Sequence, residues 1–206
     1  MILAHGAGAP ADSDFMLELA QALERNGISV VRFEFPYMQK RRSDGRKRPP
    51  DRQPKLLECF SEVVKQVRQA IPERSRVLVG GKSMGGRMAS VLASSGADVD
   101  GVVAFGYPFH PPGRPDKWRT EHFNDLECPM LIVQGTRDPF GKAEEFVSLT
   151  DAWPAVRLHW LEGGNHDFQP LARQQSSQSE LIAEAARQAA GFAQTAMAGQ
   201  ASSAGV

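Results

Sequence analysis

The chain has 206 residues, of which 41% are hydrophobic and 23% charged, and its formal net charge at pH 7 is zero. This length suits one domain with a sizeable core, and the balanced charge gives no overall field that would draw the protein to nucleic acid or a membrane surface. No run approaches the roughly 18 apolar residues of a membrane-spanning helix, and the first residues lack the regions of a secretory signal peptide, so we expect a cytoplasmic protein with no membrane partner.

Apolar runs and helical patterns alternate along the chain. In order, they predict a strand at 1–5, a helix between a cap at Asp12 or Ser13 and Gly27, a strand at 28–35, a helix at 55–71, a strand at 76–80, a helix at 84–95, strands at 99–105 and 130–134, a helix at 142–153, a strand at 156–161 and a helix at about 179–194. Most strand runs are continuous stretches of Val, Ile and Leu, which is typical of parallel strands buried on both faces. The order therefore predicts an α/β fold, a three-layer α/β/α sandwich with a mainly parallel sheet of about six strands and right-handed crossovers.

Two segments fall outside this alternation. Residues 39–55 carry eight basic residues against two acidic ones, a net charge of +6, together with three prolines that disfavour regular structure. We expect an exposed, mobile basic loop there, most often a solvated surface, with binding of nucleic acid or of an acidic partner as the alternative. Residues 195–206 are mostly small and predict a disordered tail, which leaves residues 1–194 as the folded domain. Cys59 and Cys128 form no C-x-x-C pair and are expected to be small buried residues in a reducing compartment.

The strand run at 76–80 leads directly into Gly81-Lys82-Ser83-Met84-Gly85. A serine at a sharp break between strand and helix, with glycines two residues before and after it, is the pattern of the nucleophile elbow of serine hydrolases. The turn lifts the Ser83 hydroxyl above the sheet and places the Met84 N–H at a helix N-terminus, where negative charge is favoured. The structural alternative is that Ser83 only caps a helix in a tight turn.

The other groups that such a serine needs also follow strand runs. Asp138 comes just after the run at 130–134, and His166 lies on the loop after the last run. The first run leads into His5-Gly6-Ala7-Gly8, whose backbone N–H groups can face a substrate. The chain order Ser83, Asp138, His166 is that of α/β-hydrolases, and the carboxyl ends of the strands in an open α/β sheet meet where ligands bind.

These residues have rivals and structural alternatives. Asp138 could be an exposed turn residue, and Asp167 is its rival, although it adjoins the histidine and is poorly placed to reach back. His122 precedes the fifth strand, at the wrong stage of the fold, and His5 is expected to shape the oxyanion loop. His159 lies inside a strand. No His or Cys pair has metal-ligand spacing, so we expect neither a metal nor a cofactor.

Six motifs spread over nearly the whole chain carry a resemblance to a known family. They are His5-Gly6-Ala7-Gly8-Ala9-Pro10, Gly81-Lys82-Ser83-Met84-Gly85-Gly86-Arg87, Tyr107-Pro108-Phe109-His110-Pro111-Pro112-Gly113, Arg119-Thr120-Glu121-His122, Gly135-Thr136-Arg137-Asp138-Pro139-Phe140-Gly141 and Gly163-Gly164-Asn165-His166. With them the chain resembles a lidless α/β-hydrolase of the small bacterial dienelactone-hydrolase-like group, which includes relatives of testis-expressed protein 30 and of a chromatin-complex subunit. Members of that superfamily usually have strands before the oxyanion strand, whereas Met1 opens it here, so we expect either a sheet that is short at that edge or a native chain that starts earlier.

The motifs imply acyl transfer by a Ser83, His166 and Asp138 triad, with the N–H groups of Met84 and Ala7 as the oxyanion hole. Tyr107 and Phe109, on a short proline-containing wall, are expected to line the substrate pocket; the alternative is packing against the neighbouring loop. Lys82 is a third candidate for a substrate contact, and its alternative is a local salt bridge.

These expectations favour a serine hydrolase that cleaves small or short-chain carboxylic esters through an acyl-enzyme intermediate. The short connection between the fourth and fifth strands leaves no room for a lid and little apolar surface for a long acyl chain. A thioesterase or another acyl hydrolase with the same triad is one alternative. A non-catalytic interaction protein with the same fold is another, because a fold does not fix a function. The expected partner is a small ester rather than nucleic acid, and a homodimer is left open.

Overall fold

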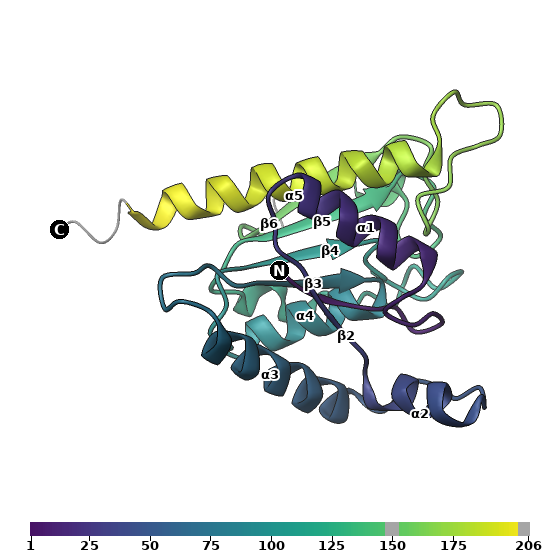
Figure 1. Cartoon of the computed structure of the whole chain (residues 1–206). Coiled ribbons are helices and arrows are strands. Elements are labelled where there is room, and N and C mark those ends of the chain that lie inside the picture. The colour runs from purple at the N-terminus through teal and green to yellow at the C-terminus, as the bar shows by residue number, and fades with distance from the viewer. Residues whose placement is uncertain (147–152, 202–206) are drawn as a thin grey trace.

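The apolar runs form six short strands, and the segments between them supply the helices (Figure 1). The computed structural model describes residues 1–146 and 153–201. The elements are β1 (Ile2–Ala4), α1 (Asp14–Arg25), β2 (Val31–Phe33), α2 (Pro36–Asp44), α3 (Gln53–Ala70), β3 (Leu78–Lys82), α4 (Met84–Ser94), β4 (Gly101–Phe105), the 3₁₀ turn η1 (Glu121–Asp125), β5 (Met130–Gly135), the 3₁₀ turn η2 (Ala143–Phe146), β6 (Val156–Leu161) and α5 (Gln178–Ala201). Within these ranges, no helix combines the length and the apolar character needed to cross a bilayer.

All strand pairs are parallel, and the strands lie in the order β2-β1-β3-β4-β5-β6. Helices α1 and α5 cover one face of the sheet, and α3 and α4 cover the other (Figure 1). The predicted three-layer α/β/α sandwich is therefore confirmed. The chain leaves β1 for β2 on one side and continues with β3 on the other, so the strand order reverses between β1 and β3. In open α/β sheets, the crevice at the carboxyl ends of the strands beside such a reversal is where ligands bind.

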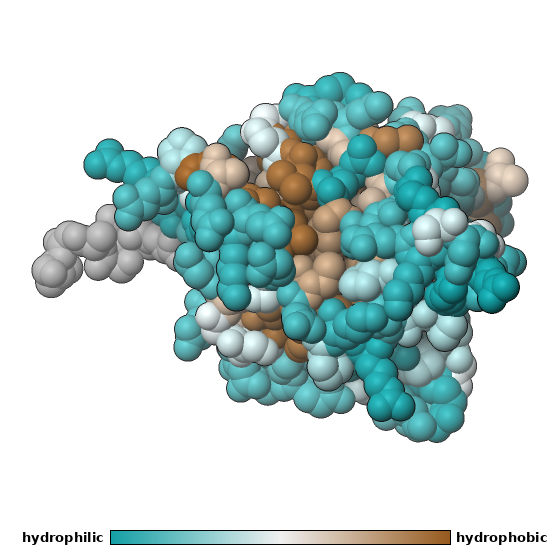
Figure 2. All heavy atoms as spheres, turned by 60° about the horizontal axis from the view of Figure 1, so that its bottom comes forward, coloured by the Kyte–Doolittle hydropathy of each residue, from teal (hydrophilic) through white to brown (hydrophobic). Residues whose placement is uncertain are grey.

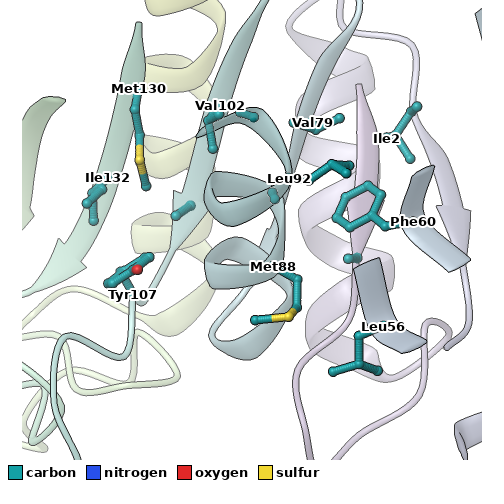
Figure 3. Packing of buried hydrophobic residues seen from close by; sticks show 14 of the residues in the cluster. Ile2, Leu56, Phe60, Val79, Met88, Leu92, Val102, Tyr107, Met130 and Ile132 are labelled. Carbon is teal, nitrogen blue, oxygen red and sulfur yellow. The ribbon is translucent and has the colours of Figure 1, made fainter. Parts of the chain in front are cut away.

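Two apolar cores hold the helices on the sheet, because neighbouring residues of each strand point to opposite faces. Ile2 and Val102 join a cluster with Phe60 beneath α3 and α4 (Figure 3). Leu3 and Val103 join the cluster beneath α1 and α5. Full burial of each large apolar side chain contributes about 1.5–3 kcal/mol. This packing fixes both layers against the sheet and with them the loops at its carboxyl edge.

The segment predicted as a basic loop is partly helical, and that prediction was wrong for its two ends. Pro36 lies in the first turn of α2, where a missing N–H removes no helical hydrogen bond, and Gly45 ends the helix with φ +69° and an N–H donated to the Arg41 carbonyl at 2.8 Å. Pro54 likewise lies in the first turn of α3. Pro36 and Pro54 therefore lie at the starts of helices, whereas residues 45–52, which contain Pro49 and Pro50, lack regular structure. The segment is mostly exposed, as expected.

Three further predictions need adjustment. The tail predicted from residue 195 is helical through Ala201, because α5 continues past the expected end, and residues 202–206 lie outside the described part of the chain. Of the helix predicted at 142–153, the structure describes the turn η2, whereas residues 147–152 lie outside the described residues. Cys128 is buried as expected, but Cys59 is only partly buried.

In the part of the chain that the structure describes, β2 is an edge strand with a neighbour, β1, on one side only. The face of the molecule that carries α2 and α3 is mostly hydrophilic, with apolar side chains gathered between polar ones (Figure 2). A groove of about 350 Å³ at the amino ends of the strands is lined by Ile28, Val31 and Val67, among others. This groove lies at the end of the sheet opposite to the carboxyl ends of the strands.

Candidate active site

Strand β3 turns sharply into α4 at Ser83, whose backbone has φ +52° and ψ −115°. A residue with a side chain is strained in this region and stays there only when its surroundings hold it. A Cβ on Gly81 would lie 2.4 Å from the carbonyl oxygen of Ala4, and one on Gly85 would lie 2.5 Å from the same atom. Both positions therefore require glycine, and the close approach of β1 and α4 leaves the Ser83 side chain at the carboxyl end of β3.

Ser83 lies within hydrogen-bonding distance of His166, which lies on the loop after the edge strand β6. The Ser83 Oγ is 2.9 Å from the Nε2 of His166, and the Nδ1 of His166 is 2.8 Å from the Oδ2 of Asp138. A carboxylate only accepts, so Nδ1 carries the proton and Nε2 accepts from the Ser83 hydroxyl. The three side chains follow β3, β5 and β6, as the sequence predicted, and the structure brings them together.

The Asp138 side chain is fully buried and its oxygens have several donors. The Phe140 N–H donates to Oδ1 at 2.9 Å, and the Gln134 amide donates to Oδ2 at 3.0 Å. Gln134 also bonds both the N–H and the carbonyl of Tyr107, which links the ends of β4 and β5. These bonds satisfy a buried carboxylate that would otherwise be costly. Sequence reasoning missed Gln134, which reads as one more residue of an apolar strand.

The loop that carries His166 is held from both sides. A Cβ on Gly135 would lie 2.3 Å from the Gly164 carbonyl oxygen, so the ends of β5 and β6 are in close contact. The Phe140 ring lies against the imidazole with centroids 4.4 Å apart. Phe168 has φ +60°, an unusual conformation for a residue with a large side chain. This packing fixes the direction in which the imidazole points.

The loop after β1 is tied back by side chains behind it. The Phe35 N–H donates to the Nε2 of His5 at 3.1 Å, so its Nδ1 carries the proton and donates to the Gly6 carbonyl at 2.7 Å. The Tyr37 hydroxyl lies 3.0 Å from the Ala7 carbonyl oxygen. Burial lowers the pKa of His5 and raises that of Tyr37 to about 12, which keeps both groups neutral. With its carbonyls held from behind, the loop can present N–H groups to the cleft.

These elements surround a cleft of about 360 Å³ at the carboxyl edge of the sheet. Ser83 and His166 lie in it, next to the loop of residues 6–9. Its apolar wall is made by Phe15 and Met16 of α1 and by Phe140. The cleft therefore combines a hydrogen-bonded serine, a helix N-terminus and a small apolar surface.

Comparisons with known proteins agree with this architecture. A family model described as "Alpha/beta hydrolase domain" matches residues 1–194. The chain belongs to the alpha/beta-hydrolase family. Among solved structures, this alpha/beta-hydrolase is similar to Est1E from Butyrivibrio proteoclasticus, with a TM-score of 0.68 and 16% identity over 96% of this chain and 87% of that one.

Two other solved structures show the same fold. A serine hydrolase homologue from Coxiella burnetii aligns with a TM-score of 0.69 and 19% identity over 91% of this chain and 83% of that one. Dienelactone hydrolase from Anabaena variabilis aligns with a TM-score of 0.66 and 18% identity over 90% and 82%. A search of curated proteins found no significant match.

Two of the predicted substrate contacts in this alpha/beta-hydrolase were wrong. Tyr107 and Phe109 are fully buried in the core beneath α4, where Phe109 packs against Trp118 and the Tyr107 hydroxyl donates to the Arg119 carbonyl. The chain turns inward at Gly106, which has φ +66°, so the two rings do not line the cleft. Phe15 and Met16 do so instead, on the helix that directly follows the predicted oxyanion loop.

Of the remaining candidate residues from the sequence, Lys82 and Asp167 line the cleft, whereas His122 and His159 lie outside it. Lys82 lines the cleft and also forms the local salt bridge, with its Nζ 3.3 Å from the Oδ1 of Asp167. Asp167 thus pairs with a lysine and not with the histidine ring. His122 bonds the Ser90 hydroxyl at 2.8 Å, and His159 pairs with Glu184 at 2.8 Å.

Proposed function

We propose that the protein is a serine hydrolase that cleaves small or short-chain carboxylic esters through an acyl-enzyme intermediate. The observation that carries the proposal is the line of hydrogen bonds from the Ser83 hydroxyl through His166 to the buried Asp138 carboxylate, at a strained turn in a cleft. This arrangement can activate a hydroxyl as a nucleophile. A serine that only caps a helix would need neither the histidine nor the carboxylate behind it.

In the proposed reaction, the Ser83 oxygen attacks the ester carbonyl while the Nε2 of His166 takes the hydroxyl proton. The C–O bond to the alcohol then breaks, and the same nitrogen gives its proton to the leaving alkoxide. Water repeats both steps on the acyl-enzyme and releases the acid and free Ser83. Asp138 holds the imidazole in the tautomer with its proton on Nδ1 and stabilises the imidazolium that forms at each step.

The carbonyl oxygen becomes negative in both steps and needs donors. The Met84 N–H opens α4, where the helix N-terminus favours negative charge, and the loop that contains Ala7 faces the cleft with its carbonyls tied to Tyr37 and His5. We therefore assign the oxyanion hole to the N–H groups of Met84 and Ala7. Removing one such donor typically costs about 10²–10³-fold in kcat.

The size of the cleft supports a small acyl group. At about 360 Å³, with an apolar wall made by Phe15, Met16 and Phe140, it is near the lower end of ligand pockets. Each methylene that enters an apolar site contributes about 0.8 kcal/mol, or about fourfold in kcat/KM, only while it is buried. The gain should therefore stop once the cleft is full.

One similar solved structure is that of ferulic acid bound to Est1E, and a carboxylic acid bound to a protein of the same fold supports an ester as the substrate class here.

The test uses a fluorophosphonate probe, which forms a bond with an activated serine. Wild-type protein should be labelled at Ser83, Ser83→Ala should not be labelled, and Ser61→Ala on α3 serves as a matched control that keeps full labelling. Folded wild-type protein that takes up no probe would overturn the proposal. A series of p-nitrophenyl esters then tests the substrate, and a kcat/KM that keeps rising into long acyl chains would contradict the small cleft. Acyl thioesters of the same chain length distinguish a thioesterase from an esterase.

A further inference from the structure

Lys82 and Asp167 form an ion pair between the two chain segments that carry Ser83 and His166. Lys82 is the last residue of β3 and directly precedes Ser83, and Asp167 directly follows His166. The Lys82 Nζ lies 3.3 Å from the Asp167 Oδ1. The lysine side chain is only 8% exposed, whereas the aspartate is 65% exposed. One ionic contact therefore joins the nucleophile strand to the histidine loop.

The ammonium group also lies near the imidazole. Gly106 has φ +66°, and a Cβ placed on it would lie 3.2 Å from the Lys82 Nζ and 3.4 Å from the His166 Nδ1. The two nitrogens therefore border the same small space, on the side of the ring that faces Asp138. The Phe15 ring covers the ammonium from α1, with its centroid 5.5 Å away.

The charges around His166 alternate in sign. Asp138 lies behind Nδ1, Asp167 is next to it in the chain, and Lys82 reaches between them from β3. Burial lowers the pKa of Lys82, while the carboxylates of Asp167 and Asp138 act in the opposite direction. A charged lysine in this position disfavours protonation of the imidazole, whereas the two carboxylates favour its protonation.

The other elements packed around the His166 imidazole contribute either apolar side chains or polar groups that form hydrogen bonds with the backbone. The His5 ring behind the β1 loop is turned toward Gly6 and Phe35, and burial lowers its pKa. The Arg137 guanidinium, after β5, donates to the Gly163 carbonyl at 2.9 Å. Helix α1 contributes Phe15 and Met16 to the cleft.

We propose that Lys82 and Asp167 are a positioning pair for the hydrolase: they tie the histidine loop to the nucleophile strand, and their opposite charges set how readily His166 takes up a proton. The kinetic part of this proposal rests on the proposed function. Neither residue needs to touch the substrate. Of the two alternatives given for Lys82 from the sequence, this proposal builds on the local salt bridge.

The two charges predict opposite effects on the pH profile of kcat/KM, whose acid limb reports protonation of the base. Lys82→Met removes a nearby cation, so the imidazolium forms more easily and the acid limb moves to higher pH, by about one unit. Asp167→Asn removes an anion and leaves the lysine charge less balanced, so the acid limb moves to lower pH. The second shift should be smaller, because Asp167 is largely exposed and screened. Loss of a purely structural contact would lower activity without opposite shifts.

The experiment compares the pH profiles of wild type, Lys82→Met, Asp167→Asn and the charge-conserving Lys82→Arg, with Lys65→Met on the exposed face of α3 as the matched control. Lys82→Arg and Lys65→Met should keep the wild-type acid limb. Shifts in the same direction, or unmoved limbs with reduced kcat, would overturn the proposal. If Lys82→Met does not fold, the downward shift in Asp167→Asn is still required.

A second readout does not depend on activity. The ring signals of the five histidines can be followed by NMR as a function of pH, with His166 assigned from its absence in His166→Gln. The midpoint for His166 should move up in Lys82→Met and down in Asp167→Asn. If wild type neither reacts with the probe nor hydrolyses esters, the proposed function fails, and this titration still decides whether the pair controls His166.

Discussion

The strained backbone at Ser83 predicts that glycine is more stable than alanine at this position, the reverse of what is found in an ordinary helix. Ser83→Ala and Ser83→Gly both remove the hydroxyl, so their difference reports the backbone alone. Holding a non-glycine residue at φ +52° and ψ −115° costs about 1–3 kcal/mol. Glycine escapes that cost but loses about 0.5–1 kcal/mol more in conformational entropy on folding. Ser83→Gly should therefore exceed Ser83→Ala in free energy of unfolding by about 1 kcal/mol.

The free energies of unfolding can be measured by urea denaturation followed by circular dichroism, supported by thermal melts. For a chain of this size, about 1 kcal/mol corresponds to a Tm difference of about 2–4 °C. The matched pair is Ser61→Ala and Ser61→Gly inside α3, where glycine should be the less stable by about 1 kcal/mol. The sign of the alanine–glycine difference should thus reverse between the two sites.

An alanine variant at Ser83 that is as stable as the glycine variant, or more stable, would refute this reasoning. It would mean that Ser83 is not held at positive φ in solution. The close contacts of Gly81 and Gly85 with Ala4 would then not enforce the turn, and the position of the hydroxyl above the sheet would need another cause.

Two more predictions concern packing and pH. Gly85→Ala places a methyl group 2.5 Å from the Ala4 carbonyl oxygen and should lower the free energy of unfolding by more than about 1 kcal/mol. Gly191→Ala on α5, where a Cβ meets nothing within 4 Å, should raise it by up to about 1 kcal/mol. Urea denaturation of both variants measures the two changes, and equal effects would contradict the close contact between α4 and β1 at Gly85. Burial lowers the pKa of His122 from 6.5 to about 4, so the unfolded chain binds the proton first and stability is lost as the pH falls from about 6.5 toward 4. His122→Gln should flatten that part of the stability–pH curve, and an unchanged curve would show that His122 is not buried as described.

Much of the fold could be predicted because its signals are local. The runs around Val79, Val103 and Ile132 are mostly apolar, and they form central strands whose residues are all buried. The carboxyl ends of those strands then place Ser83, Asp138 and His166 at one edge of the sheet. Hydrophobic periodicity and the turn residues between the runs are sufficient for this step. The carboxyl ends of parallel strands lie at the same end of the sheet, so the residues that follow them can be placed there without knowledge of side-chain contacts.

The predictions were wrong where tertiary packing determines the local backbone conformation or the position of a side chain. Pro54 was expected to prevent regular structure, yet it lies in the first turn of α3, where a proline removes no helical hydrogen bond. Tyr107 and Phe109 were expected in the cleft, but the direction of the chain after Gly106 depends on a positive φ that sequence periodicity does not reveal. For Lys82 the sequence left a substrate contact and a local salt bridge both open, because the partner Asp167 lies 85 positions away in the chain and only the fold brings the two side chains together.

The position of β6 has a consequence for how the protein loses activity. Among the described residues this strand lies at the edge of the sheet and pairs only with β5. It is mostly half-buried, yet the loop after it carries His166. The strained turn at Ser83 follows the central strand β3, and its close contacts are with the ends of β1 and β4. Half-buried edge elements open more easily than the centre of a sheet. The proposed ester hydrolysis therefore depends on an outermost strand, and heat or denaturant should abolish it before the central strands lose their secondary structure.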